Sequence, residues 1–245
     1  MASSEFQTPI ETILTDVGGV LLMPNPEFWV RLREELRPDP EVDPEAVFYG
    51  AEGPWSACRT GEIDYVSFMR AVAARLQVDA GRLEAIRSVY EVTVNQAMVE
   101  FLGAARAMGL RIVAVSNADT MLEQRLYARG LWPVFDAVVN SARVGAAKPD
   151  PRIYHHALKA AGSKPAACLL IDDKERNLPE AEEMGIQVAL FTPDEAFPER
   201  LPASVARLYP ASAPIEARGV AGGQGGRLRK RADTAFDKAF PRMLA

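Results

Sequence analysis

Cysteine and histidine are scarce in this chain, which has two of each among 245 residues. Cys58 and Cys168 lie far apart and form no Cys-x-x-Cys pair, so we expect both to be buried apolar side chains rather than ligands or a disulfide. Of the neighbouring His155 and His156, we expect one to pack and the other to face solvent on a helix. Scarce cysteine is typical of a protein of the reducing cytoplasm.

The chain also lacks an excess of basic charge and a long apolar run. Its formal net charge is -5 at pH 7, which argues against a nucleic-acid-binding protein. No run of about 18 apolar residues is present, so no membrane span is predicted. Residues 1–8 contain no apolar segment of the kind found in targeting signals. We therefore expect no nucleic acid and no membrane as partner, and a monomer or a homodimer.

Short apolar runs alternate with amphipathic segments over most of the second half of the chain. A first strand is expected at 13–15, before a glycine pair. The later elements, in two sets, are strands at 111–115, 137–140, 167–171 and 187–191 and helices at 98–108, 119–129, 150–161 and 176–184. Strands that alternate with helices pair in parallel, so the predicted fold class is α/β with a Rossmann-like doubly wound parallel sheet.

Residues 24–95 contain no convincing strand and interrupt this alternation. Helices are predicted there at 44–49, 64–76 and 80–90, which makes the segment a small all-helical insertion. The predicted division is therefore a core of residues 9–23 and 96–208 with an insertion between its parts. Residues 209–245 begin as a linker rich in proline, alanine and glycine and include a basic run at 227–231. We expect a solvated tail, with an anionic-partner or self-association segment as the alternative.

Polar residues follow the predicted strands where a parallel α/β sheet binds its ligands, beyond the carboxyl ends of the strands. They are Asp16 with Gly18 and Gly19, Ser116 with Asn117, and Asp172 with Asp173, while Lys148 stands in a loop before a helix. Each alone is compatible with a turn, a helix cap or a solvated loop residue. Together they favour one site at a single edge of the sheet.

Three neighbouring carboxylates repel one another unless a cation neutralises them, and Mg²⁺ prefers oxygen ligands. A carboxylate such as Asp16 can attack phosphorus, and Lys148 can neutralise the charge that develops on the phosphoryl oxygens. A hydroxyl such as that of Ser116 can hold the phosphoryl group by a hydrogen bond. The residues therefore indicate phosphoryl transfer.

These segments resemble, in order, the four motifs of the haloacid dehalogenase superfamily, over about residues 11–192. The first motif of that family is normally Asp-x-Asp-Gly-(Thr/Val)-Leu. The matching segments are Asp16-Val17-Gly18-Gly19-Val20-Leu21, Val113-Ala114-Val115-Ser116-Asn117, Lys148-Pro149-Asp150-Pro151 and Leu170-Ile171-Asp172-Asp173. The resemblance implies a Rossmann-like core with a helical cap domain inserted after the first strand, which agrees with the insertion at 24–95.

The resemblance also implies residue roles. Asp16 would be the nucleophile and a magnesium ligand, with the backbone carbonyl of Gly18 and the carboxylate of Asp173 as further ligands and Asp172 nearby or acting through water. Lys148 and Ser116 would be catalytic, and the substrate would be bound by Gly18, Gly19, Asn117 and Asn177. Independently of the resemblance, Arg59 is a further candidate for substrate binding, because a cationic residue of the cap can meet an anionic substrate. Trp29 and Trp55 of the cap either line the substrate entrance or only pack.

Gly18 is the main departure from the family pattern, because most family phosphatases have a second aspartate there that protonates the leaving group. Losing a positioned acid costs roughly 10²–10⁴-fold in rate. The leaving group would then be a good one, as in an anomeric, acyl or aryl phosphate. Alternatively, Glu52 or Glu62 of the cap supplies the proton, or turnover has been lost.

The sequence thus predicts a hydrolase: a magnesium-dependent phosphatase that hydrolyses a small phosphorylated metabolite through an aspartyl phosphate on Asp16. One alternative is a non-catalytic protein that binds a phosphorylated metabolite. A less favoured one is a 2-haloacid dehalogenase. Dehalogenases of the superfamily carry Asp-x-Tyr at the first motif and lack the acidic pair, which this chain keeps as Asp172 and Asp173.

Overall fold

The computed structural model describes residues 8–194 and 196–210. Five parallel strands form one sheet in the order β5-β4-β1-β6-β7. Their bounds are β1 Thr12–Thr15, β4 Arg111–Ser116, β5 Ala137–Asn140, β6 Cys168–Asp172 and β7 Gln187–Leu190. The predicted α/β class with a doubly wound parallel sheet is confirmed, and each of these strands lies within one residue of its predicted bounds.

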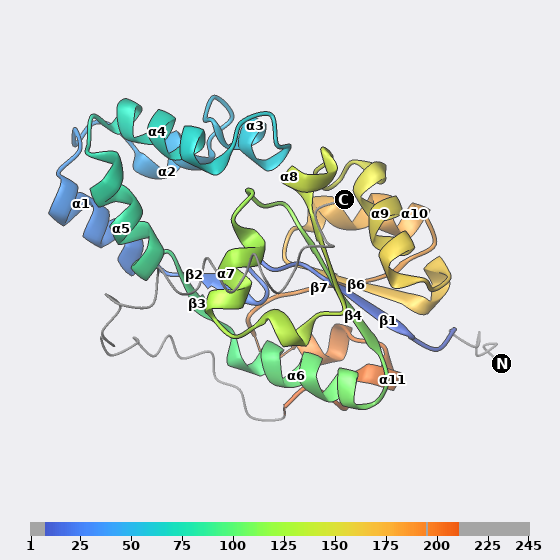
Figure 1. The fold of residues 1–245 in the computed structure, drawn as a ribbon. Coiled ribbons are helices and arrows are strands. Elements are labelled where there is room, and N and C mark those ends of the chain that lie inside the picture. Colours follow the sequence, from blue (N-terminus) through green and yellow to red (C-terminus); the bar gives the residue numbers. More distant parts are fainter. Residues whose placement is uncertain (1–7, 195, 211–245) are drawn as a thin grey trace.

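Helices cover both faces of the sheet, and the alternation of side chains along each strand decides which residues meet which helices (Figure 1). Ile13 and Ile112 pack with helices α6 (Gln96–Ala107), α7 (Leu122–Ala128) and α11 (Ala203–Ala206). Leu14 and Val113, one residue further along each strand, pack with α9 (Pro151–Ala161) and α10 (Leu178–Glu183) on the other face. Because both faces are covered, the strands are nearly continuous apolar runs.

The remaining elements of this part are short. They are α8 (Ser141–Val144) and the 3-10 helices η1 (Trp132–Val134), η2 (Pro165–Ala167), η3 (Glu175–Asn177) and η4 (Phe197–Arg200). The bounds of α9 follow from its sequence: the Asp150 side chain accepts a hydrogen bond from the Arg152 N–H, and Gly162 ends the helix at a φ of 67°. The Lys148 loop therefore leads directly into a well-defined helix start.

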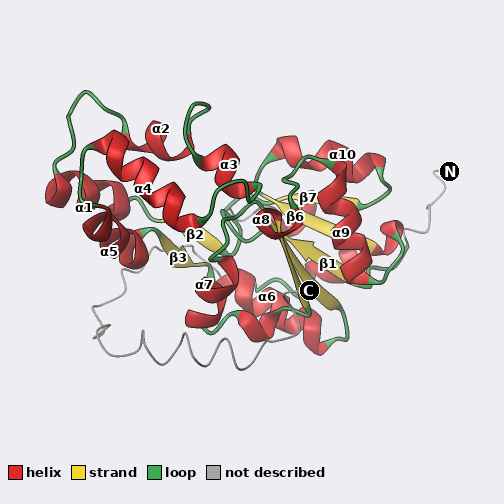
Figure 2. Cartoon of the chain, turned by 45° about the horizontal axis from the view of Figure 1, so that its top comes forward, coloured by secondary structure: helices red, strands yellow, loops and turns green. Residues whose placement is uncertain are grey.

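Five helices, α1 to α5, form a second group with its own apolar cluster, which includes Phe28, Phe48, Phe68 and Leu83. Their bounds are α1 Glu27–Leu36, α2 Pro44–Tyr49, α3 Trp55–Arg59, α4 Tyr65–Leu76 and α5 Ala80–Tyr90. Figures 1 and 2 show this helical group beside the sheet, toward the carboxyl ends of its strands. The helices predicted at 44–49, 64–76 and 80–90 are present. Helices α1 and α3 were not predicted, because α1 lies in a proline-marked stretch and α3 has only five residues.

One prediction about residues 24–95 was wrong, since the segment does contain a strand. Strand β2 (Leu22–Pro24) pairs antiparallel with β3 (Val92–Val94), and the pair joins the helical group to the sheet. A strand of three residues is too short to show a period, and its partner lies far away in sequence.

Two further sequence expectations concern the C-terminal tail and membrane-spanning helices. The predicted basic run at 227–231 and most of the linker lie outside the described residues. Within the described ranges, no helix combines the length and the apolar character that crossing a membrane requires.

Candidate active site

The polar segments predicted to share one edge of the sheet are brought together there. Asp16 follows β1, Ser116 ends β4, and Asp172 ends β6 with Asp173 next to it. Asp16, Asp172 and Asp173 each offer a carboxylate oxygen, and these three oxygens lie within 4.8 Å of one another. Three acidic groups this close form a site that could hold a metal ion.

Lys148 is the buried cation of this site. Its Nζ lies 2.9 Å from Asp16 Oδ2 and 2.5 Å from Asp172 Oδ2, and its side chain is fully buried. Burial acts to lower the pKa of Lys148, but the carboxylates of Asp16 and Asp172 outweigh burial and raise it. The ammonium group therefore stays charged across the physiological pH range.

Asp16 is held by its own turn as well as by Lys148. Its Oδ1 accepts a hydrogen bond from the Val17 N–H at 2.6 Å, and its Oδ2 contacts the ammonium group. Burial raises the pKa of Asp16 to about 6, Lys148 opposes that rise, and Asp172 and Asp173 add to it. The site thus has more negative charge than Lys148 can balance.

Asp172 has partners for both of its oxygens. Oδ1 accepts hydrogen bonds from the Lys174 N–H at 2.8 Å and the Asn177 side chain at 2.9 Å, and Oδ2 contacts Lys148. Asn177 is itself buried behind Asp172 and does not line the cavity described below. Its role in binding substrate stays a prediction, and in the structure its side chain donates a hydrogen bond to Asp172.

Asp173 is different, because its Oδ1 is buried without a hydrogen-bond partner, while its Oδ2 lies 2.8 Å from Lys174 Nζ. Gly19 makes room for this carboxylate: a Cβ on Gly19 would lie 2.2 Å from Asp173 Oδ2, and its φ is 81°. A buried acceptor left unpaired is costly. The unpaired oxygen, beside two further carboxylates, therefore fits a cation that prefers oxygen ligands.

Ser116 and Asn117 lie next to Lys148. Ser116 is buried at the end of β4 and lines the cavity. The Asn117 amide donates to the Lys148 carbonyl at 2.9 Å and accepts from the Lys148 N–H at 2.7 Å. Asn117 was predicted to bind substrate. Its amide oxygen and one of its N–H groups are used to hold the main chain of Lys148 in place.

A cavity of about 780 Å³ opens between this edge of the sheet and the helical group. Gly18 lines it, and a Cβ on Gly18 would meet no atom within 4 Å, so the space at this position is open. From the helical group, the cavity is lined by Trp29, Tyr49, Trp55 and Arg59, among others.

Arg59, a predicted substrate-binding residue, lines the cavity, and its Nε is buried without a hydrogen-bond partner. Two other expectations are not met. Glu52 and Glu62 do not line the cavity. Both His155 and His156 are exposed on α9, where one was expected to pack.

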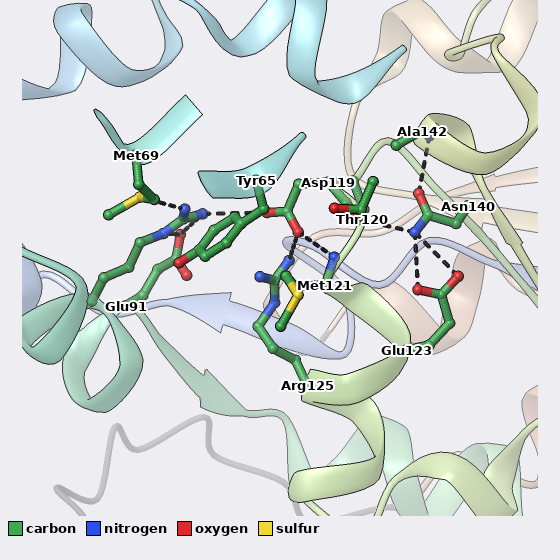
Figure 3. Close-up of polar contacts among 12 residues, drawn as sticks. Tyr65, Met69, Glu91, Asp119, Thr120, Met121, Glu123, Arg125, Asn140 and Ala142 are labelled. Carbon is green, nitrogen blue, oxygen red and sulfur yellow. Dashed lines mark hydrogen bonds and ion pairs between the residues drawn. The ribbon is translucent and has the colours of Figure 1, made fainter. Parts of the chain in front are cut away.

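A second group of charged residues on the cavity wall was not predicted from the sequence. Arg87 Nη2 lies 2.6 Å from Glu91 Oε1 and 3.7 Å from Asp119 Oδ2, and Arg125 Nη2 lies 2.8 Å from Asp119 Oδ1. Figure 3 shows Glu91, Asp119 and Arg125 converging between the helical group and α7. The four-residue spacing of Arg87 and Glu91 was a visible signal, but their pairing with the segment after Ser116 was not.

Aromatic rings help to accommodate the buried guanidinium of Arg87. Its Cζ lies 5.7, 5.2 and 5.3 Å from the ring centroids of Phe48, Tyr65 and Phe68. The guanidinium of Arg125 also contacts the Tyr65 ring, and its Cζ lies 5.7 Å from the ring centroid. Cation–π contacts of this kind gain strength where water is excluded.

Comparisons with known proteins agree with this geometry. The phosphoglycolate phosphatase of Thiobacillus denitrificans is 28% identical over 194 residues, covering 75% of this chain and 83% of that protein. The haloacid dehalogenase-like hydrolase domain-containing protein 3 of Mus musculus is 43% identical over 72 residues, which is 29% of each chain. This chain spans less than half the length of these curated relatives: the match covers 29% of the mouse protein and 38% of its Bos taurus counterpart.

Solved structures share the fold at lower identity. A haloacid dehalogenase family enzyme from Bacteroides thetaiotaomicron, in complex with magnesium and inorganic phosphate, has a TM-score of 0.63 at 21% identity, over 75% of this chain and 94% of that one. An L-2-haloacid dehalogenase has a TM-score of 0.55 at 19% identity, over 75% and 86%. The sequence model of the family described as haloacid dehalogenase-like hydrolase matches residues 10–185, which is more than half of the chain. The chain therefore belongs to the haloacid dehalogenase-like hydrolases.

Proposed function

We propose that this chain is a magnesium-dependent phosphatase that hydrolyses a small phosphorylated metabolite through an aspartyl phosphate on Asp16. The observation that carries the proposal is the excess of carboxylates around Lys148 beside a cavity of about 780 Å³. A relative named phosphoglycolate phosphatase, similar over most of this chain, supports phosphate-ester hydrolysis. The helical group within residues 24–95 would act as a cap over the core of residues 9–23 and 96–208.

The residues fit magnesium. Asp16, the backbone carbonyl of Gly18 and Asp173 would hold the ion, and Asp172 would act through water. The unpaired, buried Oδ1 of Asp173 supports this assignment. When bound, the ion would neutralise the carboxylates and the charge on the phosphoryl oxygens.

The chain's own residues would do the rest. An oxygen of Asp16 attacks phosphorus, and water then hydrolyses the aspartyl phosphate and regenerates the carboxylate. The Lys148 ammonium group, already fixed beside Asp16, stabilises negative charge on the transferred group, and the Ser116 hydroxyl donates a hydrogen bond to it. Arg59 would meet an anionic part of the substrate from the cap.

Gly18 shapes the choice of substrate, because it has no proton to give. Glu52 and Glu62 do not reach the cavity, which leaves a leaving group that departs readily as the simplest account. The same glycine is the specific observation behind a second candidate, a protein that binds a phosphorylated metabolite without turning it over.

The test is phosphate release from aryl, acyl, anomeric-sugar and alkyl phosphates with Mg²⁺, for the wild type, Asp16→Asn and the matched control Asp39→Asn in an exposed loop. We expect release that requires Mg²⁺, disappears in Asp16→Asn and persists in Asp39→Asn. Release that survives excess chelator, or that Asp16→Asn retains, would contradict the proposal. Stabilisation by phosphate without any turnover would favour the binding protein.

A further inference from the structure

The helical group presents an aromatic wall to the cavity, formed by Trp29, Tyr49 and Trp55 from three different helices. The rings contact each other edge to face: the centroids of Trp29 and Tyr49 are 6.4 Å apart at 86°, and those of Tyr49 and Trp55 are 5.5 Å apart at 87°. None of the three is fully buried. Aromatic surface that is shared between helices and still open to a cavity fits a flat apolar ligand.

Three of the four acidic side chains that line the cavity, among the described residues, are held in ion pairs. Glu91 and Asp119 are paired with arginines, and Asp173 is paired with Lys174. The fourth acid among the described lining residues, Glu45, forms no ion pair and is exposed at the start of α2. Position 18, two residues after Asp16, has open space and no side chain. The site therefore has few carboxyl groups that are free to protonate the leaving-group oxygen.

Leaving groups differ in how much they need that help. A phenol loses its proton near pH 10, whereas water, which resembles an aliphatic alcohol, does so about six pH units higher. A phenolate is consequently a stable enough anion to depart without a proton, and an alkoxide is not. An aromatic leaving group would satisfy both the chemistry of the site and the surface of the aromatic wall.

We propose that the substrates are aryl phosphates, with the ring of the leaving group against Trp29, Tyr49 and Trp55; this rests on the proposed phosphatase function. A bond forms between an Asp16 oxygen and phosphorus, and the bond from phosphorus to the aryl oxygen breaks with its electron pair left on the phenolate. Water then hydrolyses the aspartyl phosphate. Its oxygen and one proton end on phosphate, and its other proton balances the phenolate.

The first test uses the wild-type protein with Mg²⁺ and three esters: phenyl phosphate, cyclohexyl phosphate of similar size, and acetyl phosphate, which has a good leaving group without a ring. Asp16→Asn provides the blank for spontaneous hydrolysis. We expect kcat/KM for phenyl phosphate to exceed that for cyclohexyl phosphate by roughly 10²-fold or more, the size of a missing acid. Equal values for the two esters would overturn the inference.

The second test asks whether the wall recognises the ring. Trp55→Leu and Trp29→Leu should lower the ratio of kcat/KM for phenyl phosphate to that for acetyl phosphate by roughly threefold to tenfold, mainly through KM, because one aromatic contact is lost. Trp132→Leu is the matched control, since Trp132 packs against the core near α6 and does not line the cavity. A ratio unchanged in both wall variants would overturn the inference.

Two outcomes separate this inference from the proposed function. Absence of release from all three esters, acetyl phosphate included, contradicts the phosphatase itself. Release from acetyl phosphate without preference for phenyl over cyclohexyl phosphate contradicts only the aryl specificity. Glu45→Gln should keep that preference, and a large loss of cyclohexyl phosphate turnover in this variant would identify Glu45 as an acid and overturn the inference.

Discussion

Two groups of charged residues lie beside the same cavity, and one carries an excess of negative charge whereas the other is balanced. The acidic cluster consists of Asp16, Asp172 and Asp173 around the buried Lys148. The arginine cluster consists of Arg87, Glu91, Asp119 and Arg125. The acidic cluster contains three carboxylates and one buried cation, and the arginine cluster contains two guanidinium groups and two carboxylates.

The difference appears in the ionisation of similar groups. Burial raises the pKa of Asp16 to about 6, because Lys148 does not fully offset burial and the neighbouring acids. Burial acts in the same direction on Glu91, but Arg87 and Arg125 outweigh it and lower the pKa of Glu91. A balanced cluster holds its own parts together, whereas an unbalanced one is suited to a cation or a reacting group from outside.

Removing the cation of the acidic cluster should have the largest effect. We expect Lys148→Met to lower the free energy of unfolding by about 3–5 kcal/mol, because buried carboxylates lose their partner, and to abolish phosphate release. Denaturant titration with and without Mg²⁺ measures this. Mg²⁺ should stabilise the variant more than the wild type, and a loss below about 1 kcal/mol would mean that the cluster does not depend on Lys148.

Breaking the arginine cluster should affect stability alone. Arg87→Met should lower the free energy of unfolding by about 3 kcal/mol, because Glu91 and Asp119 remain buried. The shift of Tm on adding Mg²⁺ should match that of the wild type. Arg82→Met, an exposed arginine on the same helix, is the control and should change stability by no more than about 0.5 kcal/mol. A lost Mg²⁺ response in Arg87→Met would show that the two clusters are coupled.

The two clusters should also respond oppositely to pH when Mg²⁺ is absent. The folded protein keeps a proton on Asp16 up to about pH 6, above the ordinary value of 3.8, so this group makes stability fall by up to about 3 kcal/mol as pH rises through that window. The pKa of Glu91 is lowered, so its contribution is present above 4.5 and is lost as pH falls through the folded-state value. Denaturation measured from well below pH 4 up to pH 7 should show that Asp16→Asn removes the fall in stability above pH 3.8 and that Glu91→Gln removes the gain in stability that is complete at about pH 4.5.

The smallest effect is expected at the rim of the acidic cluster. The Lys174 side chain is 54% exposed, so Lys174→Met should change the free energy of unfolding by less than about 1 kcal/mol. It should also tighten Mg²⁺ binding, by no more than about fivefold, because Asp173 Oδ2 is released from its ion pair. Calorimetric titration with Mg²⁺ measures this, and weaker binding would argue against Asp173 as a ligand.

The acidic cluster could be predicted from the sequence because its members follow strands whose carboxyl ends meet at one edge of the sheet. The arginine cluster could not, because Arg87 belongs to a helix of the insertion and Asp119 to a loop of the core, and no local pattern relates them. Asn177 was assigned to substrate by its place after the acidic pair, yet its side chain turns to Asp172. Strand β3 was missed because its pairing partner lies at the other end of the insertion.

That pairing of β2 with β3 has a consequence for how the cavity is built. Leu22 and Val94 are partners across the ribbon, so the chain leaves the sheet domain and returns to it at nearly the same point. The helical group is thus a single insertion that begins and ends at one place beside the sheet, outside the pairing of β1 with β4 and β6. One continuous segment therefore supplies the helical wall of the cavity, which we propose to contact the leaving group, whereas Asp16, Lys148 and Asp173 lie outside that segment.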